Sequence, residues 1–147
     1  MPRRTAYLLA LATWFAFLVT AMLLGTAREA LFTVRLGEYP AHVVGTLLFI
    51  VMVLLIMGNF VRRVGHSVHP QDLWLIGLMW MVMTVCFEFL FFHFVAGVPL
   101  ETLLAEYNLL AGRLWLLVLL TLLCGPRLLS MYFRRQPPRE FASPLKK

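Results

Sequence analysis

The chain has few charged residues and few cysteines. Charged side chains make up 14% of its 147 residues and apolar side chains 61%, whereas soluble domains carry roughly 25% charged residues. The two cysteines, Cys86 and Cys124, form no CxxC or CxxCH motif. Because both lie in apolar stretches at different expected depths, we interpret them as small buried hydrophobic residues rather than as a disulfide. This composition argues against a soluble domain and a disulfide scaffold.

The chain also lacks the short motifs that carry common enzyme chemistry. It contains no GxSxG nucleophile motif, no glycine-rich phosphate loop and no HExxH metal motif. Ser67 follows His66, but both lie in a short polar loop, and we interpret Ser67 and Ser130 as loop or interface residues rather than as nucleophiles. Enzyme activity is therefore the least favoured class, and we predict a protein without catalytic residues.

What the chain does contain is four long hydrophobic runs, at residues 7–24, 43–61, 73–95 and 109–125. Each has about the 17–25 residues that a helix needs to cross a hydrocarbon core of ~30 Å. Short connections make successive helices antiparallel neighbours. The pattern predicts an all-α, integral membrane four-helix bundle that forms one domain over residues 1–133. We expect the first run to be retained rather than cleaved as a signal peptide, and residues 134–147 to form a basic tail.

The positive charges lie mostly on one side of these predicted spans. Arg3 and Arg4 precede the first span, Arg62 and Arg63 lie in the middle loop, and six more Lys or Arg follow the fourth span, which makes 10 of 13. Because Lys and Arg accumulate in cytoplasmic loops, we expect both termini in the cytoplasm. The charge is explained by topology and contact with membrane lipid, so we expect no nucleic-acid partner.

Glu88 stands out because it lies within a run of phenylalanines in the third span. Gly77, Thr84 and Glu88 are spaced by seven and four residues, which places them on one helical face. Small residues favour close helix packing, so we expect this face, and Ala12, Ala16 and Thr20 on the first helix, to point into the bundle. Asp72 is expected to cap the start of the third helix.

An arginine on the next span reaches a similar depth. Glu88 lies ~22 Å from the cytoplasmic edge, and Arg113 lies ~20 Å from it on the antiparallel fourth helix. An unpaired charge at this depth costs several kcal/mol, so such groups usually pair. We therefore predict a Glu88–Arg113 ion pair. Glu106 could share the guanidinium, because it lies on the same helical face as Arg113.

More polar residues reach the same outer level. Arg28 and Glu29 are expected to extend the buried ion-pair network. The remaining members form a predicted outer cluster, consisting of Arg35, Glu38, His42, His93, Tyr107 and Asn108. The cytoplasmic halves of the spans are nearly apolar by comparison. The pattern predicts a bundle that is polar at its outer end and apolar at its inner end.

Three functions remain open on this pattern. The first is an accessory or docking subunit, or a self-associating protein, in which the charges hold the helices in register. The second is a small transporter or channel, working as a homodimer through the buried Glu88, since membrane carboxylates are candidates for proton or cation handling. The third is a haem or metal subunit using His42 and His93, with Glu38 or Glu106 completing a metal site. We favour the first, because a transport route needs polar groups along its whole length.

The chain also resembles a family of small four-span bacterial inner-membrane proteins of unassigned function. The stretches that carry the resemblance are "GTAREALFTVRLGEYPAHVVGTLL", "LMWMVMTVCFEFLFFHFVAG" and "EYNLLAGRLWLLVLL". Phe92 departs from the family pattern, in which a glycine is usual before the histidine. The resemblance implies a bacterial cytoplasmic membrane location and no particular activity. The matching positions are Arg28, Glu29, Gly37, Glu38, Ala41, His42, Phe87–Phe89, His93, Gly97, Glu106–Asn108, Gly112, Arg113 and Trp115.

Overall fold

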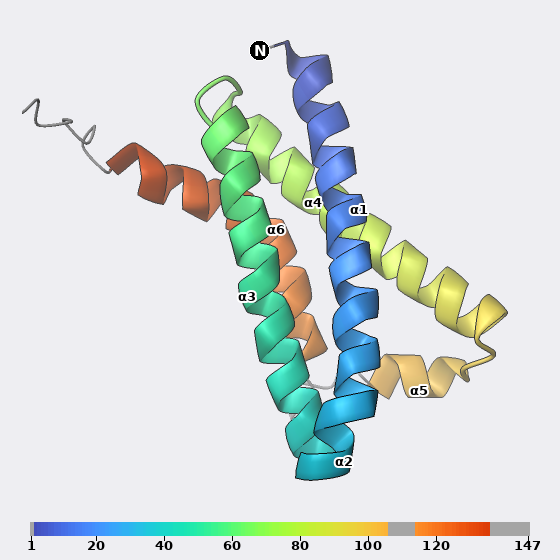
Figure 1. Ribbon diagram of the computed structural model, residues 1–147. Coiled ribbons are helices and arrows are strands. Elements are labelled where there is room, and N and C mark those ends of the chain that lie inside the picture. The colour runs from blue at the N-terminus through green and yellow to red at the C-terminus, as the bar shows by residue number, and fades with distance from the viewer. Residues whose placement is uncertain (1, 106–113, 136–147) are drawn as a thin grey trace, which may run out of the picture.

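The computed structural model describes residues 2–105 and 114–135, and every element in these ranges is helical (Figure 1). The backbone follows from the composition, since helices satisfy their own N–H and C=O groups in an apolar environment. The elements in chain order are α1 (Arg3–Ala27), η1 (Arg28–Phe32), α2 (Thr33–Leu36), α3 (Glu38–Val64), α4 (Pro70–Glu88), η2 (Phe89–Val95), α5 (Leu100–Ala105) and α6 (Trp115–Arg135).

Four continuous helical stretches are long and apolar enough to cross a membrane, namely Arg3–Leu36, Glu38–Val64, Pro70–Val95 and Trp115–Arg135. The predicted all-α four-helix architecture is therefore confirmed. The first three stretches contain the predicted spans. The fourth differs, because α6 continues through Pro126 to Arg135 instead of ending at residue 125, and residues 109–113 lie outside the described ranges.

The two ends of the bundle are named here by their connections. The loop end carries the start of α1, the segment 65–69 between α3 and α4, and the C-terminal end of α6 (Figure 1). The Gly37 end carries the turn between α2 and α3 and, on α4, the η2 segment. Gly37 and Gly97 have φ values of 84° and 68°, which glycine tolerates best, and each follows the end of a helix.

The helices are not neighbours in simple chain order. α3 lies between α1 and α6, and α4 packs mainly against α6. The expectation that successive spans pack side by side is confirmed for α1 with α3 and for α4 with α6. It is wrong for α3 and α4, which are joined by a short segment yet make few backbone contacts with each other. The reason is the close approach of α4 to α6. A Cβ on Gly77 would overlap the carbonyl oxygen of Leu123, so only glycine permits this spacing.

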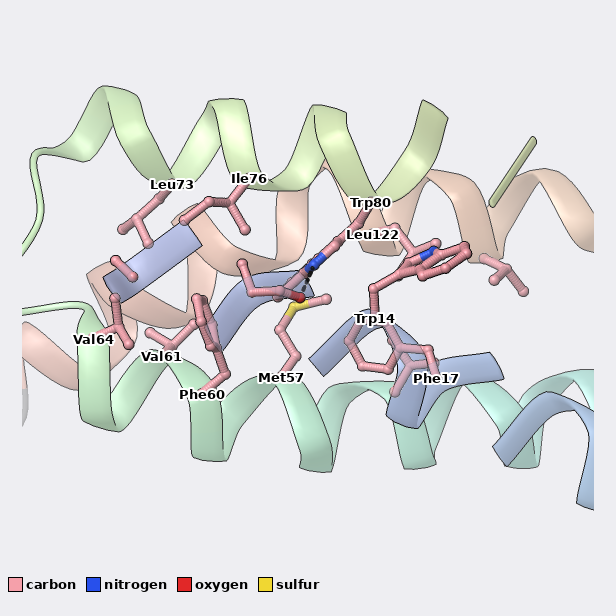
Figure 2. Packing of buried hydrophobic residues seen from close by; sticks show 14 of the residues in the cluster. Trp14, Phe17, Met57, Phe60, Val61, Val64, Leu73, Ile76, Trp80 and Leu122 are labelled. Atoms are coloured by element: carbon pink, nitrogen blue, oxygen red, sulfur yellow. Dashed lines mark hydrogen bonds between the residues drawn. The ribbon is translucent and has the colours of Figure 1, made fainter. Parts of the chain in front are cut away.

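The apolar core lies toward the loop end of the bundle (Figure 2). Trp80, fully buried, makes edge-to-face contacts with Phe17 of α1 and Phe60 of α3, at centroid distances of 5.0 and 5.2 Å. The residues of α1 that face this core are Ala6, Ala10, Trp14 and Phe17. The small-residue face predicted for α1 is wrong, because Ala12 is exposed and Ala16 and Thr20 are only half-buried.

Candidate functional site, a polar stripe along α4

Polar groups on α4 recur every four residues along the side that contacts other helices. Asp72, Trp80, Thr84 and Glu88 follow this spacing, and the apolar Ile76 occupies the remaining position. Each of the four polar members forms a hydrogen bond to another helix. We call these four residues the α4 stripe. A spacing of four residues drifts by about 40° per step around a helix with 3.6 residues per turn. The stripe therefore turns from α1 at the loop end toward α6 at its other end.

The stripe begins at Asp72, which is 1% exposed. Its Oδ1 accepts hydrogen bonds from both Nε of Arg3, at 3.1 Å, and Nη2 of the same guanidinium. The Tyr7 hydroxyl donates to Oδ1 at 3.3 Å, and the backbone N–H of His69 donates to Oδ2 at 3.3 Å. Asp72 therefore caps α4 as the third helical residue of a capping box, while His69 is the N-cap residue, so Asp72 is not the N-cap that the sequence predicted. The carboxylate also ties the first turns of α1 to the start of α4.

Two tryptophans continue the connection between α1 and α4. The Trp80 indole N–H donates to the backbone carbonyl of Ala10 at 2.8 Å (Figure 2). The Trp14 indole N–H donates from α1 to the Thr84 hydroxyl at 3.1 Å. Because apolar surroundings offer no water as an alternative partner, a donor placed here needs an acceptor on a neighbouring helix. The two bonds thus specify how α1 and α4 are aligned.

Glu88 is the last member of the stripe and is 7% exposed, which confirms the expectation that it points into the bundle. Its Oε2 accepts a hydrogen bond of 2.7 Å from the Trp115 indole N–H at the start of α6. The Glu88–Arg113 ion pair stays a prediction, because Arg113 and Glu106 lie outside the described residues. Sequence reasoning did not anticipate the bond to Trp115.

Arg28 and His42 meet near the Gly37 end, where Nη1 of Arg28 lies 3.2 Å from Nδ1 of His42. Gly45 makes room for the arginine side chain, since a Cβ there would come within 3.3 Å of the Arg28 Cδ. Nη2 of Arg28 also lies 3.5 Å from the Glu29 carboxylate, whose side chain is 76% exposed. Glu29 is therefore at the surface instead of inside the predicted buried network.

The other predicted members of the outer cluster are dispersed where the structure describes them. His93 on η2 is exposed, and its Nδ1 lies 3.1 Å from the carbonyl oxygen of Val98 in the connection that follows. Arg35 and Glu38 are exposed. Tyr107 and Asn108 lie outside the described residues. Among residues 2–105 and 114–135 no three His, Cys, Asp or Glu side chains lie together as a metal site would require. The metal hypothesis for His42 and His93 therefore gains no support from the described residues.

The loop end is more polar than the sequence suggested. The sequence analysis does not predict the contacts of Asp72 with Arg3 and Tyr7 of α1. The four-residue spacing of Asp72, Trp80, Thr84 and Glu88 was the available signal. Cys86 and Cys124 are free thiols, and Cys86 is exposed rather than buried as expected.

Comparison of the chain with protein-family models, curated proteins and solved structures finds no match.

Proposed function

We propose that the chain is a non-catalytic accessory or docking subunit of a bacterial cytoplasmic membrane complex. The observation that carries this proposal is the α4 stripe, in which polar side chains of the apolar interior bond neighbouring helices. Groups used in this way hold a fixed arrangement of helices. A rigid membrane domain is suited to presenting a constant surface to a partner.

The threonines of the helices support the same interpretation. Thr13, Thr20, Thr46 and Thr121 each donate a hydroxyl hydrogen bond to the carbonyl oxygen four residues earlier, at 2.7 to 2.9 Å. Such bonds satisfy a hydroxyl within its own helix. A conduction route needs polar groups that face a shared path and exchange partners. These threonines favour a structural role over such a route.

The surface offered to a partner lies where α4 leaves α1. Figure 1 shows the η2 end of α4 diverging from α1 toward α5. Leu90, Phe94 and Val95 on η2 are 59%, 75% and 71% exposed. We propose that another membrane protein, or a second copy of the chain, packs on this η2 face. We also propose that the loop end faces the cytoplasm, because its arginines follow the pattern of cytoplasmic loops.

A matched pair of substitutions tests the docking proposal. Leu90→Trp enlarges an exposed side chain on η2, and Leu55→Trp makes the same change at a 64% exposed position of α3. We expect the complex purified from native membranes at native expression to lose its stoichiometric partner with Leu90→Trp and to keep it with Leu55→Trp. A chain that purifies alone from native membranes contradicts the proposal.

The second candidate is a small homodimeric transporter, which the burial of Glu88 favours. Glu88→Gln keeps an acceptor for Trp115 and removes the titratable carboxyl. Transport predicts that Glu88→Gln abolishes proton or solute flux in proteoliposomes, while the exposed Glu101→Gln does not. Under the docking proposal neither variant changes flux and both retain the partner.

A further inference from the structure

α6 consists of two parts that meet at Pro126. The first part, from Trp115 to Gly125, packs among the other helices, and the second turns aside from it at the loop end (Figure 1). Pro126 is buried and has no N–H to donate to the carbonyl oxygen of Leu122. A proline inside a helix removes this bond and bends the helix. The chain therefore changes direction at Pro126, the residue after the predicted span 109–125, instead of continuing along the bundle axis.

The second part of α6 is held against the end of α3. The Arg62 guanidinium lies over the Phe133 ring, with Cζ 4.8 Å from its centroid. Arg134 Nη2 donates to the backbone carbonyl of Gly65 at 2.7 Å, at the C-terminus of α3. A cation at this position also interacts favourably with the helix dipole. These contacts fix the direction in which the segment leaves the bundle.

The outward side of this segment is apolar and is bordered by arginines. Leu128, Met131 and Tyr132 are 58%, 37% and 59% exposed, and their three- and four-residue spacing places them on one helical face. Arg127 is half-buried and Arg135 is exposed. An apolar face flanked by Lys or Arg is the pattern of a helix that lies in the interface of a membrane.

The charge of the loop end indicates which lipid would occupy this surface. Its described residues include seven arginines, which are Arg3, Arg4, Arg62, Arg63, Arg127, Arg134 and Arg135. Asp72 is its acidic residue within the described ranges, and Arg3 already pairs with it. None of the other six arginines forms a salt bridge with a carboxylate of a described residue. Basic residues at a membrane surface attract anionic headgroups.

We propose that residues 126–135 form an interfacial helix, and that this helix and the end of α3 bind anionic phospholipids of one leaflet. Leu128, Met131 and Tyr132 insert among the upper acyl chains. Arg63, Arg127 and Arg135 contact the phosphates. Arg62 and Arg134 hold the segment in place through Phe133 and Gly65. This role is independent of the docking surface on η2 and of the partner proposed there.

Lipid selectivity tests the proposal directly. The protein is equilibrated in mixed micelles with equal amounts of phosphatidylglycerol and phosphatidylcholine, and retained lipids are counted by native mass spectrometry. We expect the wild type to retain more phosphatidylglycerol. The combined variant Arg63→Gln, Arg127→Gln and Arg135→Gln should lower the ratio of the two lipids at least about fivefold, the effect expected from one surface arginine. It leaves the structural contacts of Arg62 and Arg134 intact.

Arg35→Gln is the control, since Arg35 is an exposed arginine near the Gly37 end. It should leave the lipid ratio unchanged. Equal retention of both lipids by the wild type, or an unchanged ratio in the combined variant, would overturn the proposal. The proposal would also be overturned if the wild type showed no lipid preference and the combined variant instead lost a copurifying acidic protein. The occupant of this surface would then be a protein.

A depth measurement tests the same proposal without removing charges. A nitroxide is attached at Tyr132→Cys or at Leu55→Cys in a background with Cys86→Ala and Cys124→Ala, in vesicles of the same two lipids. We expect the label at residue 132 among the upper acyl chains, accessible to oxygen and partly to a water-soluble relaxation agent, and the label at residue 55 near the bilayer centre. A label at residue 132 that meets only the aqueous agent would contradict the interfacial position.

Discussion

The half of the molecule nearer the loop end, the loop half, holds α1 and α4 together, whereas in the half nearer the Gly37 end, the Gly37 half, the two helices separate. In the loop half the two helices are joined by Asp72 with Arg3, by Trp80 with Ala10 and by Thr84 with Trp14. In the Gly37 half α4 departs from α1, and its stripe ends at Glu88 on Trp115 of α6 (Figure 1). The printed hydrogen bonds between α1 and α4 are thus confined to the end of the bundle at which these two helices lie together.

Toward the Gly37 end the backbone of both α1 and α4 changes to a wider, π-helical turn. α1 passes into the π-helical η1 at Arg28, and α4 passes into the π-helical η2 at Phe89. The Ala96 N–H bonds the Phe91 carbonyl oxygen at 3.0 Å, five residues earlier. Each wider turn rotates the following side chains away from the positions of a regular helix. His93 is accordingly exposed, whereas Glu88, five residues earlier, is buried.

Among the substitutions that test this comparison, the largest loss of stability is expected at Gly77. Gly77→Ala places a methyl group against the carbonyl of Leu123 and forces α4 away from α6. We expect a loss of about 1–3 kcal/mol in the free energy of unfolding, measured by denaturing detergent titration in mixed micelles. Gly25→Ala is the control, since nothing lies within 4 Å of its added Cβ. Equal stability of the two variants would show that the close approach of α4 and α6 does not contribute to the free energy of unfolding.

The tryptophan bonds allow the two halves to be compared directly. Trp115→Phe removes the donor to Glu88, and we expect it to cost about 0.6 kcal/mol and at most about 1.7, as for other membrane interhelical hydrogen bonds. Trp80→Phe should cost more, because this fully buried side chain also loses packing volume. The same detergent titration measures both variants.

Trp74→Phe provides the control for these substitutions, because Trp74 is 43% exposed. It should leave the unfolding midpoint close to that of the wild type. If Trp115→Phe were as stable as Trp74→Phe, the bond to Glu88 would contribute nothing to the Gly37 half. The comparison of the two halves would then depend on the Asp72 contacts alone.

A double-mutant cycle on Arg3→Gln and Asp72→Asn sharpens the account of the loop half. Each single variant should lower stability, because the 1% exposed Asp72 carboxylate loses its charged partner or its own charge. The combined loss should be smaller than the sum of the two single losses. Additive losses, measured by thermal unfolding in detergent, would show that the pair does not couple α1 to α4.

The smallest effect is expected at the end of α6. Arg134→Gln removes the bond to the Gly65 carbonyl and should cost about 0.3–1 kcal/mol, the range for a cation at a helix C-terminus. Arg135→Gln is the matched control, because this exposed neighbour makes no hydrogen bond or ion pair with another described residue. Thermal unfolding of the two variants side by side measures the difference. An equal or larger loss in Arg135→Gln would show that the bond of Arg134 to the Gly65 carbonyl does not stabilise the contact between α6 and α3.

Sequence reasoning identified the inward direction of Glu88 because a helical face can be read from spacing. It could not identify Trp115 as a partner, since two residues on different helices meet only through the crossing of α4 and α6. It also predicted that α1 packs through Ala12, Ala16 and Thr20. That prediction failed because the larger Trp14 and Phe17 fill the space beside Trp80.

The sequence by itself determined the four hydrophobic helices and the expected polar face of α4, because membrane length and helical periodicity are local properties. The tertiary structure decided that α4 does not pack along α3, although a short segment joins the two, and that Asp72 binds α1. These outcomes depend on where helices cross. A missing side chain at Gly77 and the reach of an arginine or a tryptophan across the interface set that crossing, and neither is a property of one helix alone.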